Sequence, residues 1–144
     1  MLHVAIRMKV KRLDIDVTLP SYAHPGDAGL DLYSRELRTL EQGEPHLFRL
    51  GFSAEFPEGH VAMLCDRSSM GKKGVRVLGG IIDAHYRGEW GVILVNLTNK
   101  EVKIKPGDKI AQALLLPIAT VDVRKSDELT ETRRGAGGFG STGR

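Results

Sequence analysis

The C-terminal segment of the chain carries side chains that are suited to hold a nucleotide. Glycines dominate residues 133–144, and Arg134, Phe139, Ser141 and Thr142 stand between them. Glycines let backbone N–H groups approach anionic oxygens, a guanidinium binds phosphate through two hydrogen bonds, and a phenyl ring offers a stacking face for a base. The same composition fits a flexible linker, but a linker needs no cation, ring or hydroxyl. We therefore predict a lid over nucleotide phosphates.

A second candidate anion site begins where a predicted strand ends. Arg67, Ser68 and Ser69 follow the apolar run 61–65 closely, so a guanidinium, two hydroxyls and backbone amides gather where a strand gives way to a turn. The alternative is a capped helical turn with a surface arginine. Residues 71–74 read Gly-Lys-Lys-Gly and lack the hydroxyl residue of a Walker A sequence.

Asp83 is the candidate general base. It lies in the glycine-bounded segment 80–88, three residues before Tyr86. A carboxylate beside a bound triphosphate and its metal can activate water for in-line attack on phosphorus, and an ordinary turn aspartate is the alternative. Asp27 and Asp31 lie four residues apart near the first turn. Alternate residues of a strand face the same way, so we expect one of the two to help place Mg²⁺ through water.

Composition limits the class of protein. The 144 residues fit one domain, and 41% hydrophobic with 27% charged residues is ordinary for a folded globular chain. The net charge of +3 is spread along the sequence, which gives weak support for polynucleotide binding. Cys65 is the only cysteine, so we expect no disulfide, no thiolate metal cluster and a cytoplasmic setting. No run reaches the roughly 18 apolar residues of a membrane span, and the five histidines lack metal-ligand spacing.

Short apolar runs separated by turn residues predict an all-β fold. No stretch sustains the apolar stripe of a long helix, which argues against Rossmann and P-loop architectures. Residues 68–73 and 126–133 are each short enough for a helical turn or two. The pattern predicts a β-sandwich or barrel over residues 1–124 and an arm over 125–144. Strands are expected at 4–10, 48–56, 61–65, 92–97, 102–105 and 110–123.

Taken in order, five segments resemble the five motifs of the trimeric dUTP diphosphatase (dUTPase) family. Together they span nearly the whole chain, and their order is as informative as their residues. The matching segments are Asp27 to Leu32, Arg67 to Gly71, Gly80 to Gly88, Gly107 to Gln112, and the glycine-rich C-terminal segment.

The resemblance implies a single jelly-roll-like β domain, 1–144, and a homotrimer with active sites at subunit interfaces. It implies Mg²⁺-dependent cleavage of dUTP to dUMP and pyrophosphate, which limits uracil incorporation into DNA and supplies dUMP for thymidylate synthesis. It gives Asp83 the task of orienting the water that attacks the α-phosphorus. Asp31 would support the metal through its waters, and Tyr86 would stack under the deoxyribose, where a 2′-hydroxyl would clash.

Further contacts with dUTP are implied in the same way. Phe139 would stack on uracil, and Arg134 would hold the γ-phosphate. No stable contact with nucleic acid or a membrane is expected, and the setting is cytoplasmic or that of a virus-encoded intracellular protein. The remaining residues assigned to the phosphates, the base hairpin and the lid are Arg67, Ser68, Ser69, Gly80, Ile82, Gln112, Gly140, Ser141 and Thr142.

Two positions depart from the family pattern. Asp66 stands where the second motif usually begins with proline. Adjacent residues on an extended strand point to opposite faces, so we expect Asp66 to point away from the triphosphate while Arg67 points toward it. Val77 and Leu78 stand where many relatives carry an asparagine, so backbone groups of the hairpin are expected to recognise uracil.

Two other functions fit the same fold. A dCTP deaminase would need a catalytic glutamate near the base, and the complete C-terminal motif argues against it. A nucleotide-binding relative without catalysis is the other alternative. Retention of Asp83 together with the lid argues against that one.

Overall fold

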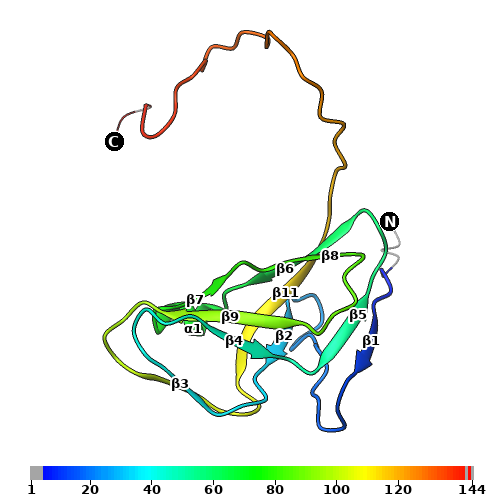
Figure 1. The fold of residues 1–144 in the computed structure, drawn as a ribbon, viewed down its shortest axis with the longest axis vertical. Coiled ribbons are helices and arrows are strands. Elements are labelled where there is room, and N and C mark those ends of the chain that lie inside the picture. The colour runs from blue at the N-terminus through cyan, green and yellow to red at the C-terminus, as the bar shows by residue number, and fades with distance from the viewer. Residues whose placement is uncertain (1–4, 142, 144) are drawn as a thin grey trace.

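The computed structural model describes residues 5–141 and 143, shown in Figure 1. Within this part the chain is almost entirely β, with one short helix. The elements are β1 (Lys9–Arg12), β2 (Leu30–Tyr33), β3 (Arg38–Leu40), β4 (His46–Arg49), β5 (Phe52–Glu55), β6 (His60–Cys65), α1 (Ser68–Lys72), β7 (Val75–Leu78), β8 (Ile81–Asp83), β9 (Gly91–Asn96), β10 (Val102–Ile104) and β11 (Lys109–Pro117).

The strands form four antiparallel sheets. The largest has the order β2-β11-β6-β8, the next has the order β4-β9-β7, and β1-β5 and β3-β10 are pairs. The all-β prediction with at most one short helix is confirmed. Of the two architectures expected, the barrel is wrong, because the sheets stay separate and do not close on one another.

A continuous apolar core joins these sheets. Trp90 is fully buried, and its ring centroid lies 5.3 Å from that of Phe52 and 6.4 Å from that of Phe56. Truncating a buried aromatic side chain typically costs about 3–5 kcal/mol. Inward-facing residues of β5, β6, β9 and β11 complete the core, so the strands that carry the candidate site rest on a packed interior.

Several predicted elements have different bounds in the structure. The expected strand 48–56 is two strands, β4 and β5, because Gly51 takes a φ of +75° and turns the chain between them. The last strand ends at Pro117, as a residue without a backbone N–H favours. Residues 126–133 form no helix, and the described part of 4–10 enters a strand only at Lys9.

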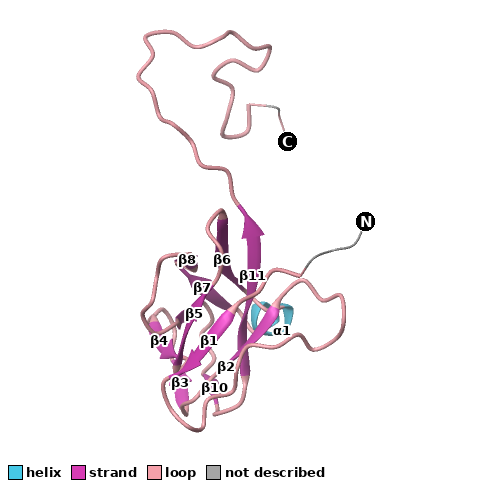
Figure 2. Cartoon of the chain, turned by 90° about the vertical axis from the view of Figure 1, so that its right-hand side faces the viewer, coloured by secondary structure: helices cyan, strands magenta, loops and turns pink. Residues whose placement is uncertain are grey.

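After β11 the chain leaves the body of the molecule. Figures 1 and 2 show residues beyond Pro117 running away from the sheets without a strand or helix. In the described residues, no helix has the length and apolar character needed to cross a membrane.

Candidate active site

The connection between β7 and β8 carries the chain from one sheet to another. Gly80 lies at this crossing with a φ of +99°, which an L side chain rarely adopts. A Cβ atom at Gly80 would stand 2.7 Å from the backbone oxygen of Leu64, and the Leu64 N–H donates to the Gly80 oxygen at 2.7 Å. Glycine at this position therefore lets the connection between β7 and β8 pack directly on β6.

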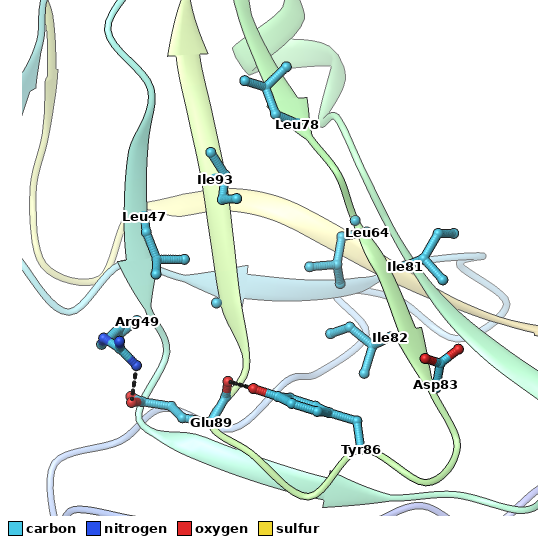
Figure 3. A pocket seen from close by; sticks show the side chains of 12 residues that line it. Leu47, Arg49, Leu64, Leu78, Ile81, Ile82, Asp83, Tyr86, Glu89 and Ile93 are labelled. Atoms are coloured by element: carbon cyan, nitrogen blue, oxygen red, sulfur yellow. Dashed lines mark hydrogen bonds and ion pairs between the residues drawn. The ribbon is translucent and has the colours of Figure 1, made fainter.

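Asp83 is the last residue of β8, and Tyr86 closes the turn that follows it. The Tyr86 backbone N–H donates to the Asp83 oxygen at 3.0 Å, and the Tyr86 hydroxyl donates to the Glu89 oxygen at 3.0 Å. The ring lies against Gly88, where a Cβ atom would stand 2.3 Å from the hydroxyl oxygen. Figure 3 shows the ring reaching across the floor of a cavity of about 370 Å³.

The Asp83 carboxylate is exposed at the edge of this cavity. Within residues 5–141 and 143 it has no hydrogen bond or ion pair. A carboxylate without a partner keeps its lone pairs available for water. The sequence-predicted residues Gly80, Ile82, Asp83 and Tyr86 all line this cavity, so the structure brings the third motif together.

Apolar side chains form another wall of the cavity. Leu47, Ile93 and Leu78 come from the adjacent strands β4, β9 and β7, and each is directly paired with its neighbour across the sheet. All three are at least 36% exposed, and Figure 3 shows them on one face. Sequence reasoning missed this row, although alternation in β9 already placed Ile93 opposite to the buried Val92 and Leu94.

Charged residues line the end of the cavity beside Tyr86 (Figure 3). Glu89 pairs with Arg49 at 3.2 Å and accepts the Gly51 N–H at 2.9 Å. Arg87 donates to the Ala84 oxygen at 2.7 Å and thereby holds the turn that follows Asp83. Glu89 and Arg49 were not among the predicted site residues, and only the position of Glu89 just after the third motif pointed to it.

Arg87 also reaches the neighbouring strand β5. Its guanidinium lies 3.8 Å from the Glu55 carboxylate. The hydrogen bond from Lys9 and, more weakly, the charge of Arg87 lower the pKa of Glu55. Glu55 therefore stays ionised at neutral pH and helps to anchor the turn.

Arg67 stands at the start of α1, and its side chain is held on several sides. Its Nε lies 3.2 Å from Asp31 Oδ1, and its Nη1 donates to Ser69 Oγ and to the Lys109 backbone oxygen, both at 3.2 Å. Ser68 and Ser69 are exposed at the first turn of α1. The structure thus brings Arg67, both serines and Asp31 together, and the predicted helical turn at 68–73 is confirmed.

Asp31 is a buried carboxylate between two cations. It is 6% exposed, and Lys109 Nζ lies 2.8 Å from the oxygen that Arg67 leaves free. A buried carboxylate is stable when it is paired in this way. No group of three His, Cys, Asp or Glu side chains suited to a metal occurs among the described residues. The role of Asp31 as a support for the metal through water stays a prediction.

Gln112 fixes the loop before Arg67. Its Nε2 donates to the Asp66 backbone oxygen at 2.8 Å, and a Cβ atom at Gly29 would stand 2.3 Å from its Oε1. Gly29 in the first motif therefore leaves room for the side chain of Gln112 in the fourth motif. These motifs line a second cavity of about 320 Å³ formed by Ala23, His24, Asp27, Ala28, Gly29, Asp31, Arg67, Ser68 and Gln112.

The Asp66 side chain points away from Arg67, as predicted. Its Oδ1 accepts the Val77 backbone N–H at 2.6 Å, and its Oδ2 lies 2.5 Å from Arg76 Nε. The carboxylate is directed to β7, so it does not face the cavity that contains Arg67.

The two cavities share no residue, and β6 separates them. Val61, near the start of β6, lies opposite Asp83, whereas Arg67 follows the other end of the strand. At about 3.3 Å per residue, the six steps from residue 61 to residue 67 span roughly 20 Å. Asp83 and the Arg67 loop of one chain therefore do not meet at the same phosphate group.

The described residues of the glycine-rich segment, 133–141 and 143, line neither cavity. Arg134 donates to the Gly137 oxygen of its own turn at 2.9 Å, and the Phe139 ring is fully exposed with a backbone φ of 51°. Gly140 takes a φ of 91°, and Ser141 is exposed. Thr142 lies outside the described residues. The structure does not bring these residues to the other candidates.

Comparison with known proteins agrees with this fold and these motifs. The sequence profile of dUTPase matches residues 16–143. The deoxyuridine 5′-triphosphate nucleotidohydrolase of Clostridium tetani is 45% identical over 140 residues, which cover 95% of this chain and 97% of that protein. The protein with the same name from a Hydrogenobaculum species is 44% identical over 142 residues, covering 96% of this chain and 99% of its own length.

Solved structures show the same fold. The dUTPase of Staphylococcus bacteriophage 80alpha with dUpNHpp has a TM-score of 0.87 and 28% identity, covering 96% of this chain and 99% of that one. The dUTPase of phage phi11, described with a structural Mg(II) ion, has a TM-score of 0.78 and 26% identity over 87% of this chain and 99% of its own. Fold and site together define an all-β nucleotide hydrolase. The chain belongs to the dUTPase family.

Proposed function

We propose that the chain hydrolyses dUTP to dUMP and pyrophosphate, and thereby limits uracil incorporation into DNA and supplies dUMP for thymidylate synthesis. The observation that carries the proposal is the Asp83 carboxylate, which is exposed and has no partner among residues 5–141 and 143, at the rim of a cavity that also contains Tyr86. Relatives at 45% and 44% identity carry the corresponding name.

The reaction uses Asp83 as a general base. The carboxylate accepts a proton from a bound water, whose oxygen forms a bond to the α-phosphorus. The bond from that phosphorus to the bridging oxygen breaks, and pyrophosphate leaves. A positioned general base typically contributes about 10²- to 10⁴-fold in rate.

Arg67, Ser68 and Ser69 hold the phosphates in this mechanism. The Arg67 guanidinium is fixed by Asp31 at 3.2 Å, and a planar guanidinium matches phosphate oxygens with two hydrogen bonds. Gln112 keeps the preceding loop in place through its bond to the Asp66 oxygen. The site is therefore preorganised for charge on the leaving pyrophosphate.

Mg²⁺ fits the site as an ion that arrives with the substrate. Magnesium keeps several waters and needs only one or two carboxylates beside phosphate oxygens, which agrees with the lack of a three-residue metal group in the described residues. Asp31 would hold it through water. When bound, it neutralises charge on the phosphates.

The connection between β7 and β8, together with β8 and Tyr86, recognises the base and the sugar. Gly80 and Ile82 are fixed against β6 by the Leu64–Gly80 hydrogen bond and by the β6–β8 pairing, so their backbone presents a rigid edge to uracil. The Tyr86 ring lies under the deoxyribose and leaves no room for a 2′-hydroxyl.

The complete site is formed by a homotrimer. Asp83 and Arg67 of one chain are roughly 20 Å apart along β6, so each active site combines the Asp83 cavity of one subunit with the Arg67 cavity of another. The exposed row of Leu47, Ile93 and Leu78 beside the first cavity gives a neighbouring subunit an apolar surface to cover. Residues 1–124 form the β core of each subunit, and residues 125–144 form an arm that closes a site.

A substrate panel tests the proposed function. With Mg²⁺, we expect pyrophosphate release from dUTP to exceed that from UTP, dTTP or dCTP by at least about 100-fold, because a clash or a misfit removes transition-state binding. Chromatography identifies the nucleotide product. Equal rates on UTP would contradict the role of Tyr86, a deaminated product from dCTP would favour the deaminase alternative, and binding without turnover would favour the non-catalytic one.

A further inference from the structure

Asp66 is bound from both its side chain and its backbone. The carboxylate accepts the Val77 N–H at 2.6 Å and pairs with Arg76 at 2.5 Å. The backbone oxygen of the same residue accepts the Gln112 amide at 2.8 Å. One residue therefore connects β7 of the three-stranded sheet with β11 of the four-stranded sheet, directly before Arg67.

The hydrogen bond between Val77 and Asp66 lies at an edge of the three-stranded sheet. β7 is the last strand in the order β4-β9-β7, so one side of it has no strand partner within the described residues. A short charge-assisted hydrogen bond to a backbone N–H is stronger than a neutral one. The carboxylate thus replaces a missing strand neighbour and holds the loop against β7.

We propose that Asp66 is a positioning residue for the phosphate-binding loop, a role that rests on the proposed function of Arg67. Proline, which the family motif usually carries here, stiffens a loop by fixing its own φ. Aspartate instead fixes the loop by tying it to β7. The Arg67 guanidinium then meets the phosphates in one orientation, without the ordering cost that a mobile loop would add.

Two substitutions of Asp66 separate the contribution of its hydrogen bond from that of its charge. In Asp66→Asn the side-chain oxygen still accepts from Val77, now as a weaker neutral hydrogen bond, and the charge pair with Arg76 is lost, which at a partly exposed site matters little. In Asp66→Ala both interactions are lost. A carboxylate that acted by repelling the substrate would behave oppositely, because both variants would then bind phosphates more tightly.

The experiment compares wild type, Asp66→Ala, Asp66→Asn and Arg76→Gln. We expect Asp66→Ala to raise KM for dUTP and the Kd for inorganic tripolyphosphate by about tenfold, with a smaller change in kcat. Asp66→Asn and Arg76→Gln stay within about threefold of wild type. Because Asp66→Asn keeps the shape of the side chain, tighter tripolyphosphate binding by that variant would overturn the proposal even if Asp66→Ala did not fold.

Asp14→Ala is the matched control. Asp14 also accepts a backbone N–H, from Ile15 at 2.7 Å, and pairs with an arginine, Arg35, at 2.6 Å, but it lines neither cavity. We expect it to lower Tm without changing KM. If Asp66→Ala lowered Tm and left both KM and tripolyphosphate affinity unchanged, the residue would be structural only. Failure of wild type to hydrolyse dUTP would overturn the proposed function, whereas the tripolyphosphate affinities would still decide the role of Asp66.

Discussion

Asp83 and Asp31 are chemically identical side chains in opposite surroundings. Asp83 is exposed at the rim of its cavity, whereas Asp31 is buried and paired with Arg67 and Lys109. The Asp31 carboxylate is already engaged by two cations, whereas the exposed Asp83 carboxylate can accept hydrogen bonds from water. Its surroundings therefore suit Asp83 to act as a base, whereas those of Asp31 suit it to hold neighbouring cations in place.

At this scale we expect Asp83→Asn to lower kcat for dUTP by about 10²- to 10⁴-fold, the usual contribution of a general base. The amide has nearly the same size and makes no new clash on an exposed side chain. The non-hydrolysable analogue dUpNHpp should bind with nearly wild-type affinity in calorimetry. Near-normal turnover by this variant would show that another group activates the water.

Residue types in the sequence pointed to much of the candidate site, but not to the contacts between its residues. Asp83, Tyr86 and Arg67 were found because a carboxylate, a ring and a cation near glycines have recognisable chemistry. Their separation along β6 and the Asp31–Lys109 pair depend on strand register, which joins residues far apart in sequence. Such contacts arise from packing of the whole chain, so local patterns do not contain them.

At the scale of elements, strands with clear alternation were predicted best. β6 and β9 match the predicted runs within a residue or two. β2, β3, β7 and β8 were missed, because three or four residues are too few for a periodic pattern to emerge. Residues 126–133, which were short enough for a helical turn or two, form none, since no apolar face exists there to pack on the core.

The segment after β11 leads to a testable prediction at the scale of elements. Deleting the residues after Arg133 should leave a folded trimer and lower kcat/KM for dUTP at least about 100-fold, because Arg134 and Phe139 supply contacts to charge and base. The expected result is this loss of kcat/KM together with a mass by light scattering that corresponds to a trimer of the shortened chain. A variant in which 125–131 is replaced by a glycine-serine linker is the control, and it should retain most of the activity.

At the scale of the whole molecule, the two cavities define how subunits cooperate. An Asp83→Asn subunit keeps an intact Arg67 cavity, and an Arg67→Ala subunit keeps an intact Asp83 cavity. Mixed at equal amounts and assembled together, they should recover activity, because about a quarter of the sites then combine two unaltered halves in a cyclic trimer. Each variant alone should be nearly inactive. Lack of recovery in mixed trimers, verified by differently tagged subunits, would place both halves in one chain.

The length of β6 therefore has a genetic consequence. Two alleles that are each inactive, one damaged near Asp83 and the other near Arg67, are expected to complement in the same cell. Two alleles damaged at the same end of β6 should not, because no mixed assembly then contains an unaltered site. A single strand of six residues would thus divide mutations in this gene into two complementation groups.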